Sequence, residues 1–293
     1  MNTQEAYLID KARVRLSFNR AAASYDAAAV LQREVRARML ARLDLVKLAP
    51  QRILDAGAGT GSAALALAQR YSGSQVVALD LALNMLSQAG AKESWLSRMT
   101  GFGRMAKICG DLERLPLSDA CMDMVWSNLA LQWCNDLDAA FTGVNRVLRA
   151  EGLFMFSTFG PDTLKELRAA SQADPDYVHV SRFIDMHDIG DALIRAGFSA
   201  PVMDVEHFTL TYDDVRAVMR DLKAIGAHNA AQGRRRGLEG KGFLQGLAER
   251  YEAFRQDGKL PATFEVIYGH AWKGQPLTRQ ADGAQVIRMH RRT

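Results

Sequence analysis

Three glycines at alternate positions, Gly57, Gly59 and Gly61, follow a short apolar run in the segment ILDAGAGTGSAALALAQR, residues 53–70. An alanine-rich, helix-forming stretch comes directly after them. A turn without side chains lets a ligand approach the backbone closely. The helix that follows offers unpaired N–H groups and a partial positive charge at its start. The pattern therefore predicts a strand, a tight turn and a helix that bind a nucleotide-like ligand.

The residues around these glycines narrow the identity of the ligand. Gly57 and Gly59 fit the dinucleotide fingerprint G-x-G-x-x-G, but Ser62 stands where its third glycine belongs. Asp55, two residues before the first glycine, would repel a pyrophosphate and attract an ammonium group. The order D-x-G-x-G-x-G therefore favours S-adenosylmethionine, which has a zwitterionic amino-acid end and a cationic sulfur, over a nicotinamide dinucleotide.

This segment resembles the first motif of class I S-adenosylmethionine-dependent methyltransferases, and the resemblance implies roles for residues further along the chain. Asp80 would accept hydrogen bonds from both ribose hydroxyls, with Leu81 beside it. Asp111 would accept a proton from the adenine amino group while Leu112 packs on the ring. Asn128 would line the methionine end. A single Asp at a strand end is more often a turn or helix cap. The prediction of a cofactor site therefore depends on the combination of the glycine turn with the residues that follow the later strands.

The resemblance extends over nearly the whole chain to one family, the malonyl-acyl-carrier-protein O-methyltransferases of biotin synthesis. The segments FSTFGPDTLKEL and VIYGHAW discriminate best, because the cofactor motifs are shared by many methyltransferases. The similar segments are SFNRAAASYDAAAVLQREV, NLALQWCND, FSTFGPDTLKELR, FIDMHDIGDALIRAGF and FEVIYGHAW.

The resemblance also implies a reaction, and that reaction sets requirements for the residues of the site. The family methylates the free carboxylate of a malonyl group on acyl carrier protein, with S-adenosylhomocysteine as the other product. Methylation removes the negative charge of the malonyl carboxylate. Fatty-acid enzymes can then elongate the malonyl methyl ester toward the pimeloyl precursor of biotin. A carboxylate has a reference pKa of about 4 and is already a nucleophile at neutral pH. Positioning is then the main requirement, and we expect neither a general base nor a metal.

A malonyl carboxylate in a closed site does need a cation, because burying it unpaired costs several kcal/mol. Arg182 is our first candidate and Arg20 the second, since an arginine fork suits a carboxylate. Either residue could instead form an ordinary surface ion pair.

Aromatic residues are expected around the reacting groups. We expect Tyr25, together with Phe18, to cap the cofactor as a lid and Trp133 to wall the methyl pocket, although each could be an ordinary core residue. Tyr268 and His270 are expected to face the same crevice from the last strand. His270 has no partner at metal-ligand spacing, so a metal role is not expected.

The carrier protein is acidic, so a basic surface should receive it. The segment 213–260 is rich in arginine and lysine, and we expect it to cover the site and bind the carrier, with Arg234, Arg235 and Arg236 in contact. A solvated loop is the plainer interpretation of the same charges.

Strand and helix signals alternate around these residues. Strands are expected at 52–56, 74–80, 104–111, 122–131 and 153–159, with a helix over 136–152 that Gly152 ends. This alternation predicts an α/β fold with a doubly wound, mostly parallel sheet and a ligand crevice at its carboxyl edge. A late antiparallel pair, 201–212 and 263–272, completes seven strands. The expected parts are a helical lid (1–45), a cofactor-binding core (46–212), a helical insertion (213–260) and a last strand with a basic tail (261–293).

Composition excludes several classes of protein. The 293 residues carry a net charge of only +4, which does not indicate nucleic-acid binding. No apolar run reaches 18 residues and no signal peptide is evident, so no membrane association is expected. Cys109, Cys121 and Cys134 form no disulfide or zinc pattern, which favours the cytoplasm.

Two other functions share the cofactor pattern. One is a methyltransferase that modifies the carboxyl or a carbon of a small molecule and ignores the carrier. The other is a methyltransferase-like assembly factor that modifies a partner protein. The sequence leaves open the oligomeric state and the preference for carrier protein over coenzyme A.

Overall fold

Seven strands form one sheet in the computed structural model, which describes residues 3–92, 105–171, 180, 183–227, 229–234 and 241–274. The strand order is β3-β2-β1-β4-β5-β7-β6. The first five strands are parallel, and β7 runs antiparallel to both of its neighbours. The predicted α/β fold is confirmed. The strands are β1 Arg52–Ala56, β2 Gln75–Asp80, β3 Ala106–Cys109, β4 Met122–Asn128, β5 Leu148–Phe159, β6 Phe198–Tyr212 and β7 Leu260–Lys273.

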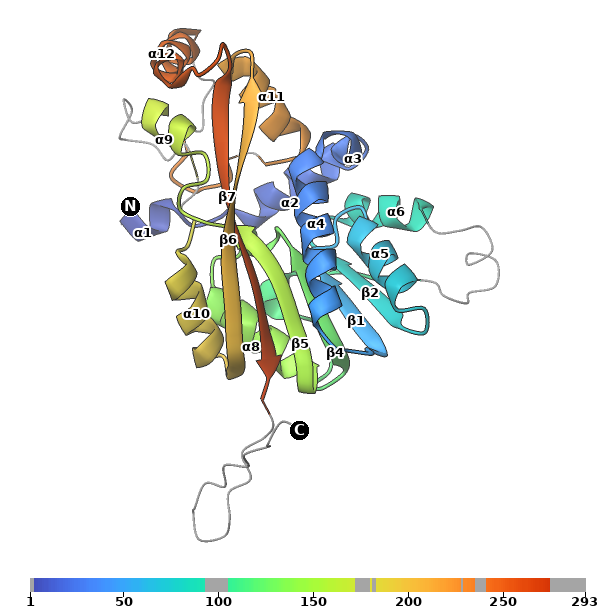
Figure 1. The fold of residues 1–293 in the computed structure, drawn as a ribbon. Coiled ribbons are helices and arrows are strands. Elements are labelled where there is room, and N and C mark those ends of the chain that lie inside the picture. Colours follow the sequence, from blue (N-terminus) through green and yellow to red (C-terminus); the bar gives the residue numbers. More distant parts are fainter. Residues whose placement is uncertain are drawn as a thin grey trace.

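Helices cover both faces of this sheet (Figure 1). α4, α5 and α6 lie on one face and α8 and α10 on the other, while α2 and α3 lie near the carboxyl edge of the parallel strands. The helices are α1 Thr3–Ala6, α2 Lys11–Ala21, α3 Tyr25–Ala28, α4 Val30–Arg42, α5 Ser62–Arg70, α6 Leu83–Ala91, α8 Leu137–Val147, α9 Lys165–Ser171, α10 Met186–Arg195, α11 Val215–Ala224 and α12 Lys241–Tyr251.

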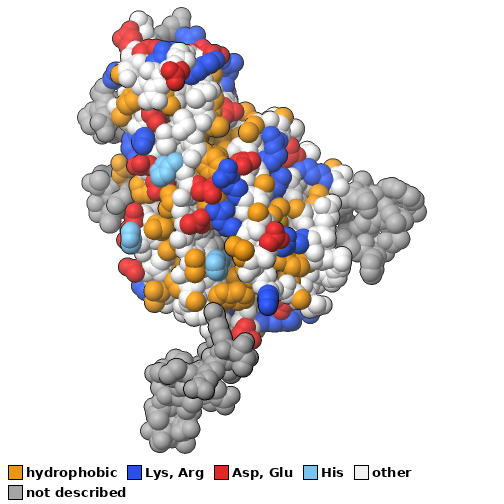
Figure 2. Space-filling model, in the orientation of Figure 1, with side chains coloured by type: hydrophobic (Ala, Val, Ile, Leu, Met, Phe, Trp, Pro, Cys, Tyr) orange, Lys and Arg blue, Asp and Glu red, His pale blue; other side chains and the backbone are white. Residues whose placement is uncertain are grey.

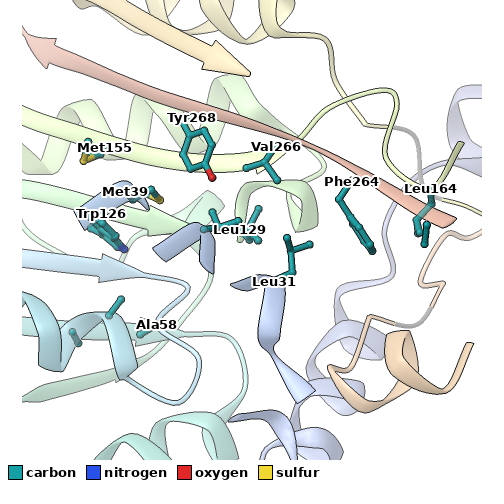
Figure 3. Packing of buried hydrophobic residues seen from close by; sticks show 14 of the residues in the cluster. Leu31, Met39, Ala58, Trp126, Leu129, Met155, Leu164, Phe264, Val266 and Tyr268 are labelled. Carbon is teal, nitrogen blue, oxygen red and sulfur yellow. The ribbon is translucent and has the colours of Figure 1, made fainter. Parts of the chain in front are cut away.

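Side chains of alternate residues in the central strands point to opposite faces of the sheet, into two separate hydrophobic cores. Ile53 packs with the helices on the α4 side and Leu54 with those on the α8 side, and both are fully buried. The core on the α4 side continues along the sheet into the upper part of the molecule. Figure 3 shows Leu164 and Phe264 at one end of this cluster and Met39 and Trp126 at the other.

The β6–β7 hairpin is longer than the sheet it joins. β5 ends at Phe159, opposite Val266, whereas β6 and β7 stay paired up to Tyr212 and Leu260. α9, α11 and α12 pack around this projecting part, above the carboxyl edge of the parallel strands (Figure 1). α11 and α12 lie between β6 and β7 in the chain, where the sequence predicts a helical insertion, and the bounds and covering role of that insertion stay predictions.

The expected helix over 136–152 is wrong at its end. α8 stops at Val147 and β5 begins at Leu148, so Gly152 lies inside a strand. Leu148 already pairs with Met122, and the register between β4 and β5 then shifts. A Cβ at Gly152 would lie 3.2 Å from the carbonyl oxygen of Asp123, so the glycine permits close strand contact rather than a helix end.

Candidate functional site

The glycine turn is built as its spacing predicts. β1 ends at Ala56 and α5 begins at Ser62, with positive φ at Gly57, Gly59 and Gly61. A Cβ at Gly57 would lie 2.2 Å from the Cβ of Ala130, and one at Gly61 would lie 2.5 Å from that of Ala89. A Cβ at Gly59 would meet only the Tyr25 ring, at 4.0 Å. The outer glycines therefore permit packing, whereas Gly59 keeps a space open.

Asp55 is the most unusual group in the site. Its side chain is buried, and neither carboxyl oxygen has a hydrogen-bond partner among the described residues. Burial raises the pKa of Asp55 to about 7, and the charge of Asp80 acts in the same direction. Arg36 and the backbone N–H of Ala64 oppose this rise, although no hydrogen bond of ordinary geometry reaches either oxygen. A buried, unpaired carboxyl fits an incoming ammonium group.

Asp80 ends β2 directly above this turn. Its Oδ2 atom accepts a hydrogen bond from the Gly59 N–H at 2.8 Å, and its Oδ1 atom accepts one from the Ala82 N–H at 2.7 Å. Burial raises the pKa of Asp80, and these two N–H donors oppose the rise. The carboxylate therefore ties the glycine turn to the end of the neighbouring strand.

A first hollow opens beside Asp80 at the carboxyl edge of the sheet. The sequence predicts most of its walls, and α2 and α3 cover it with Lys11, Val14, Phe18 and Tyr25. Lys11 forms ion pairs with Asp111 at 2.9 Å and with Glu113 at 2.8 Å. The predicted residues that line it are Tyr25, Gly57, Gly59, Asp80, Leu81, Asp111, Leu112, Asn128 and Trp133.

A second hollow lies on the other side of the glycine turn, where Asp55, Gly57 and Gly59 meet α4. Arg36 of α4 lines it and has no hydrogen bond or ion pair among the described residues. Burial lowers the pKa of Arg36, and the largest opposing effect on this pKa is the charge of Asp26. The unpaired Arg36 guanidinium and the unpaired Asp55 carboxyl line the same hollow, which suits a ligand that carries both a negative and a positive charge.

Sequence reasoning missed Arg36. Ala29, Gln32, Arg33 and Arg36 recur at helical spacing and all line the second hollow, but the sequence does not say which side of this helix meets the glycine turn.

A third hollow adjoins the first two under the projecting hairpin. Tyr25 lines all three, while Phe18 and Trp133 line the first and the third. The Phe18 ring meets Trp133 edge-on with centroids 5.4 Å apart. Burial raises the pKa of Tyr25, so its phenol stays protonated. The remaining walls are mainly apolar: Leu129, Phe159, Leu164, Leu167, Val180, Phe183, Met219, Leu222, Ile225, Ala227 and Phe264.

Two predicted substrate residues lie elsewhere. The expected position of Tyr268 and His270 is wrong, because they line a fourth hollow that shares no residue with the first three. In Figure 3 Tyr268 lies far from Phe264, which lines the third hollow. The Arg42 guanidinium stacks 3.9 Å from the Tyr268 ring centre, and the Tyr268 hydroxyl lies 3.4 Å from Glu206. Tyr268 lies opposite Ser157, level with Asn128 at the carboxyl end of β4, and His270 lies opposite Met155, two residues further from that end.

Figure 2 shows this face of the molecule, where basic and acidic side chains lie together among apolar ones. Arg38 and Arg42 there pair with Glu206 at 2.7 and 3.2 Å. Burial lowers the pKa of His270, which keeps the ring neutral near pH 7. The charges of Arg38, Arg42 and Glu206 thus neutralise one another.

The predicted arginines are scattered. Arg20 is exposed on α2 and lines none of the four hollows. Arg234 turns inward, donating to the carbonyl oxygen of Ala231 at 2.8 Å and lying 3.6 Å from Asp10. Arg182, Arg235 and Arg236 lie outside the described residues.

Two further features could in principle serve other chemistry: the thiol of Cys134 as a nucleophile, and a cluster of possible metal ligands. Cys134 lines the first hollow, but burial raises its pKa to about 12, so it is a protonated thiol rather than a nucleophile. Asp162, His207 and Glu265 have ligand atoms within 4.8 Å of one another, the one such group among the described residues. None of the three lines the first three hollows, and Asp162 pairs with Lys165 at 3.3 Å. The absence of a metal requirement stays a prediction.

Comparison with known proteins agrees with this geometry. A methyltransferase domain family matches residues 54–156, which run from β1 into β5. A malonyl-[acyl-carrier protein] O-methyltransferase of Methylovorus sp. (strain MP688) is 66% identical over 290 residues, 99% of this chain and 98% of that protein. Another, from Gallionella capsiferriformans (strain ES-2), is 56% identical over 282 residues, 96% of this chain and 97% of that protein. The chain belongs to the malonyl-[acyl-carrier protein] O-methyltransferase family.

Solved structures agree on the fold. The YcgJ protein of Bacillus subtilis has a TM-score of 0.56 at 18% identity, over 81% of this chain and 98% of that one. Family membership and the methyltransferase domain confirm S-adenosylmethionine as the cofactor. Among the described residues, no helix has the length and apolar character to cross a membrane. The roles of individual site residues stay predictions.

Proposed function

We propose that this chain transfers the methyl group of S-adenosylmethionine to the free carboxylate of a malonyl group held by acyl carrier protein. The full-length similarity to enzymes of that name supports the reaction and the partner. The structural observation that carries the proposal is the buried, unpaired Asp55 carboxyl, which faces the same hollow as the unpaired Arg36 guanidinium.

These two residues bind the amino-acid end of the donor. Asp55 accepts from its ammonium group, and Arg36 pairs with its carboxylate. Opposite charges on the walls of this hollow select a zwitterion, because either charge alone would leave one of these groups unpaired.

The first hollow binds the nucleoside end. Asp80 keeps lone pairs for the ribose hydroxyls after its two backbone contacts, since a carboxylate accepts about four hydrogen bonds. Asp111 uses Oδ1 for Lys11 and the Glu113 N–H, which leaves Oδ2 for the adenine amino group. Leu112 is buried beside it and offers an apolar surface to the ring.

The third hollow receives the malonyl group. When bound, the donor supplies an electrophilic methyl on a cationic sulfur. Tyr25 lines all three hollows and therefore stands where donor and acceptor meet. The acceptor carboxylate is already ionised, so the chain orients it and excludes water rather than removing a proton.

The acceptor carboxylate needs a cation, and the described walls of the third hollow offer one, Lys223. It is exposed at the rim and has no hydrogen bond or ion pair within the described parts of the chain. Arg182 remains the other candidate, because Val180 and Phe183 on either side of it both line this hollow. Arg20 is the weakest of the three, since it lines none of the hollows.

A transfer assay tests the function. The protein is incubated with methyl-labelled S-adenosylmethionine and malonyl carrier protein, and label is expected on the acyl group in a base-labile ester. Equal transfer to a small malonyl acid, with no preference for the carrier, would support a small-molecule methyltransferase instead. Donor binding without transfer to any malonyl acceptor would contradict the proposed reaction and favour an assembly factor.

A further inference from the structure

The outer face of α11 carries cations that no acidic side chain neutralises within the described part of the chain. Arg216, Arg220 and Lys223 are separated by four and three residues, and Met219 lies between them, so all four share one side of the helix. All four are exposed, Met219 at 38%. None of the three cations has a hydrogen bond or ion pair within the described ranges. We call these four residues the α11 basic face.

The orientation of the helix is fixed by its other side. Val215 and Val218 are buried, at 3% and 1% exposure, in the core that continues under the hairpin. Asp214 caps the helix by accepting the Ala217 N–H at 2.7 Å. The basic face is therefore held outward rather than free to turn into the protein.

The acids of this segment are engaged elsewhere. Asp213 pairs with Lys259 beyond the helix, and Asp221 accepts the Tyr212 hydroxyl at 2.7 Å. Asp214 is used by the cap. The positive charge on the basic face is thus left for a partner outside the chain.

This face borders the third hollow. Met219 and Lys223 line its rim, and Leu222 lies on its wall. A partner seated on α11 would therefore sit beside the opening through which an acyl group enters. The lid lies close by, since a Cβ at Gly226, just after α11, would lie 3.0 Å from the Phe18 ring.

We propose that the α11 basic face is the docking surface for an acidic protein surface, that of the acyl carrier protein. This inference rests on the proposed function and names the place where its partner binds. Arg216 and Arg220 attract and orient the acidic surface, and Met219 supplies an adaptable apolar contact between them. Of the arginines that the sequence predicts to contact the carrier, Arg234 is described. Its side chain is held by Ala231 and Asp10 and is therefore not available to bind the carrier.

The test is the charge reversal Arg216→Glu/Arg220→Glu. Its matched control is Lys47→Glu/Arg52→Glu, which changes the net charge equally. Lys47 and Arg52 are exposed at the amino end of β1, away from the carboxyl edge of the sheet. The substrates are malonyl carrier protein and the malonyl thioester of N-acetylcysteamine, which has no protein surface and no phosphate.

The α11 variant should raise the KM for malonyl carrier protein by roughly tenfold or more and weaken its salt dependence. The control should stay within about twofold, and the small thioester should respond to neither variant. Equal KM values for the carrier in both variants would overturn the proposal. So would an equal loss with the small thioester, because the variant would then damage the site itself.

Direct binding separates this proposal from the reaction. Calorimetry with carrier protein should show weaker binding to the α11 variant than to the control, whether or not methyl transfer occurs. If wild-type protein binds the donor but methylates no malonyl acceptor, the proposed function fails. If the two variants bind the carrier equally, the docking proposal alone fails.

Discussion

The Oδ2 atom of Asp80 accepts a hydrogen bond from the Gly59 N–H over 2.8 Å, across 21 residues of sequence. The contact joins the end of β2 to the middle of the glycine turn after β1. Gly57 and Ala58 strengthen the junction by donating their N–H groups to the carbonyl oxygen of Leu79, at 2.8 and 2.9 Å. The turn is therefore held in shape without a ligand, which lowers the ordering cost of binding.

Gly57 and Gly59 should respond differently to substitution by alanine. In Gly57→Ala the new methyl meets Ala130 at 2.2 Å with φ at +83°, so the free energy of unfolding should fall by about 3 kcal/mol. In Gly59→Ala only the left-handed backbone costs stability, about 1 kcal/mol. The Gly59→Ala methyl stands between the first and second hollows, so donor affinity should fall by more than about tenfold.

Urea unfolding and calorimetry with S-adenosylmethionine check both effects. A Gly59→Ala protein that binds the donor normally would contradict the placement of the donor. A Gly57→Ala protein of unchanged stability would contradict the packing described here.

Asp55 should make the stability of the ligand-free protein fall as pH rises. Its folded pKa of about 7 lies above its unfolded value, so the favourable contribution is fully present below pH 4 and lost as pH rises to about 7. The difference corresponds to about 4 kcal/mol at most. Asp55→Asn should therefore stabilise the ligand-free protein at pH 8, change little at pH 4, and abolish donor binding.

Denaturant unfolding at both pH values measures this. Asp257→Asn, at an exposed position, is the control and should show no such pH dependence. If Asp55→Asn has the same effect at both pH values, the buried carboxyl is not ionising in this range.

Arg36→Met should weaken every ligand that carries the donor's amino-acid end. Loss of a charge-assisted contact predicts roughly a 10- to 100-fold rise in Kd for S-adenosylmethionine and S-adenosylhomocysteine. Methylthioadenosine lacks the amino acid and should bind unchanged, because the first hollow is intact. Arg15→Met, an exposed residue of α2 outside the hollows, is the control. If the affinity for all three ligands fell equally, Arg36 would not be the residue that binds the amino-acid end of the donor.

The glycine pattern and the resemblance to a methyltransferase family pointed to residues that line the first two hollows, although their roles stay predictions. Asp55, Asp80 and Asp111 each follow an apolar run, and parallel strands bring such ends together at one edge. Arg36 was missed because an arginine on a helix before the first strand has no motif. Only the packing of α4 against the turn shows that it faces the hollow.

The acceptor side could not be predicted in the same way. Tyr268 and His270 were expected in the crevice because they sit near the end of the chain's last strand in a discriminating motif. β7 lies three strands away from β1 and runs antiparallel, so Tyr268 is level with the carboxyl end of β4 but packs under Arg42, while His270 lies two residues below that end. Which part of an antiparallel strand reaches the edge depends on register, and register is a property of the paired strands.

Release of product should depend on the contacts that hold the residues just before α2. Ile9 forms an antiparallel bridge with Ala231, and Asn135 holds the Ile9 backbone with hydrogen bonds of 2.6 and 3.0 Å. α2 follows at once and covers the first hollow. Asn135→Ala removes both bonds, so the release rate of S-adenosylhomocysteine should rise by roughly 5- to 30-fold.

Stopped-flow release measures this effect, and hydrogen exchange should quicken in α2 but not in β1. Gln245→Ala on α12 is the control, since its bond to Glu249 is exposed and distant in sequence from the lid. An unchanged release rate in Asn135→Ala would show that the lid opens without this contact.

Lys223→Met should impair methyl transfer to the small malonyl thioester while leaving donor affinity unchanged. Lys223 lines the third hollow but neither the first nor the second, so its ammonium can meet the acceptor and not the donor. Loss of a charged contact predicts a fall in kcat/KM of roughly 10- to 100-fold. Lys223 also belongs to the α11 basic face, but the thioester carries no docking protein, so the effect cannot come from lost docking. Arg182→Met, measured beside it, decides between the two cations: a larger loss there would assign the carboxylate to Arg182.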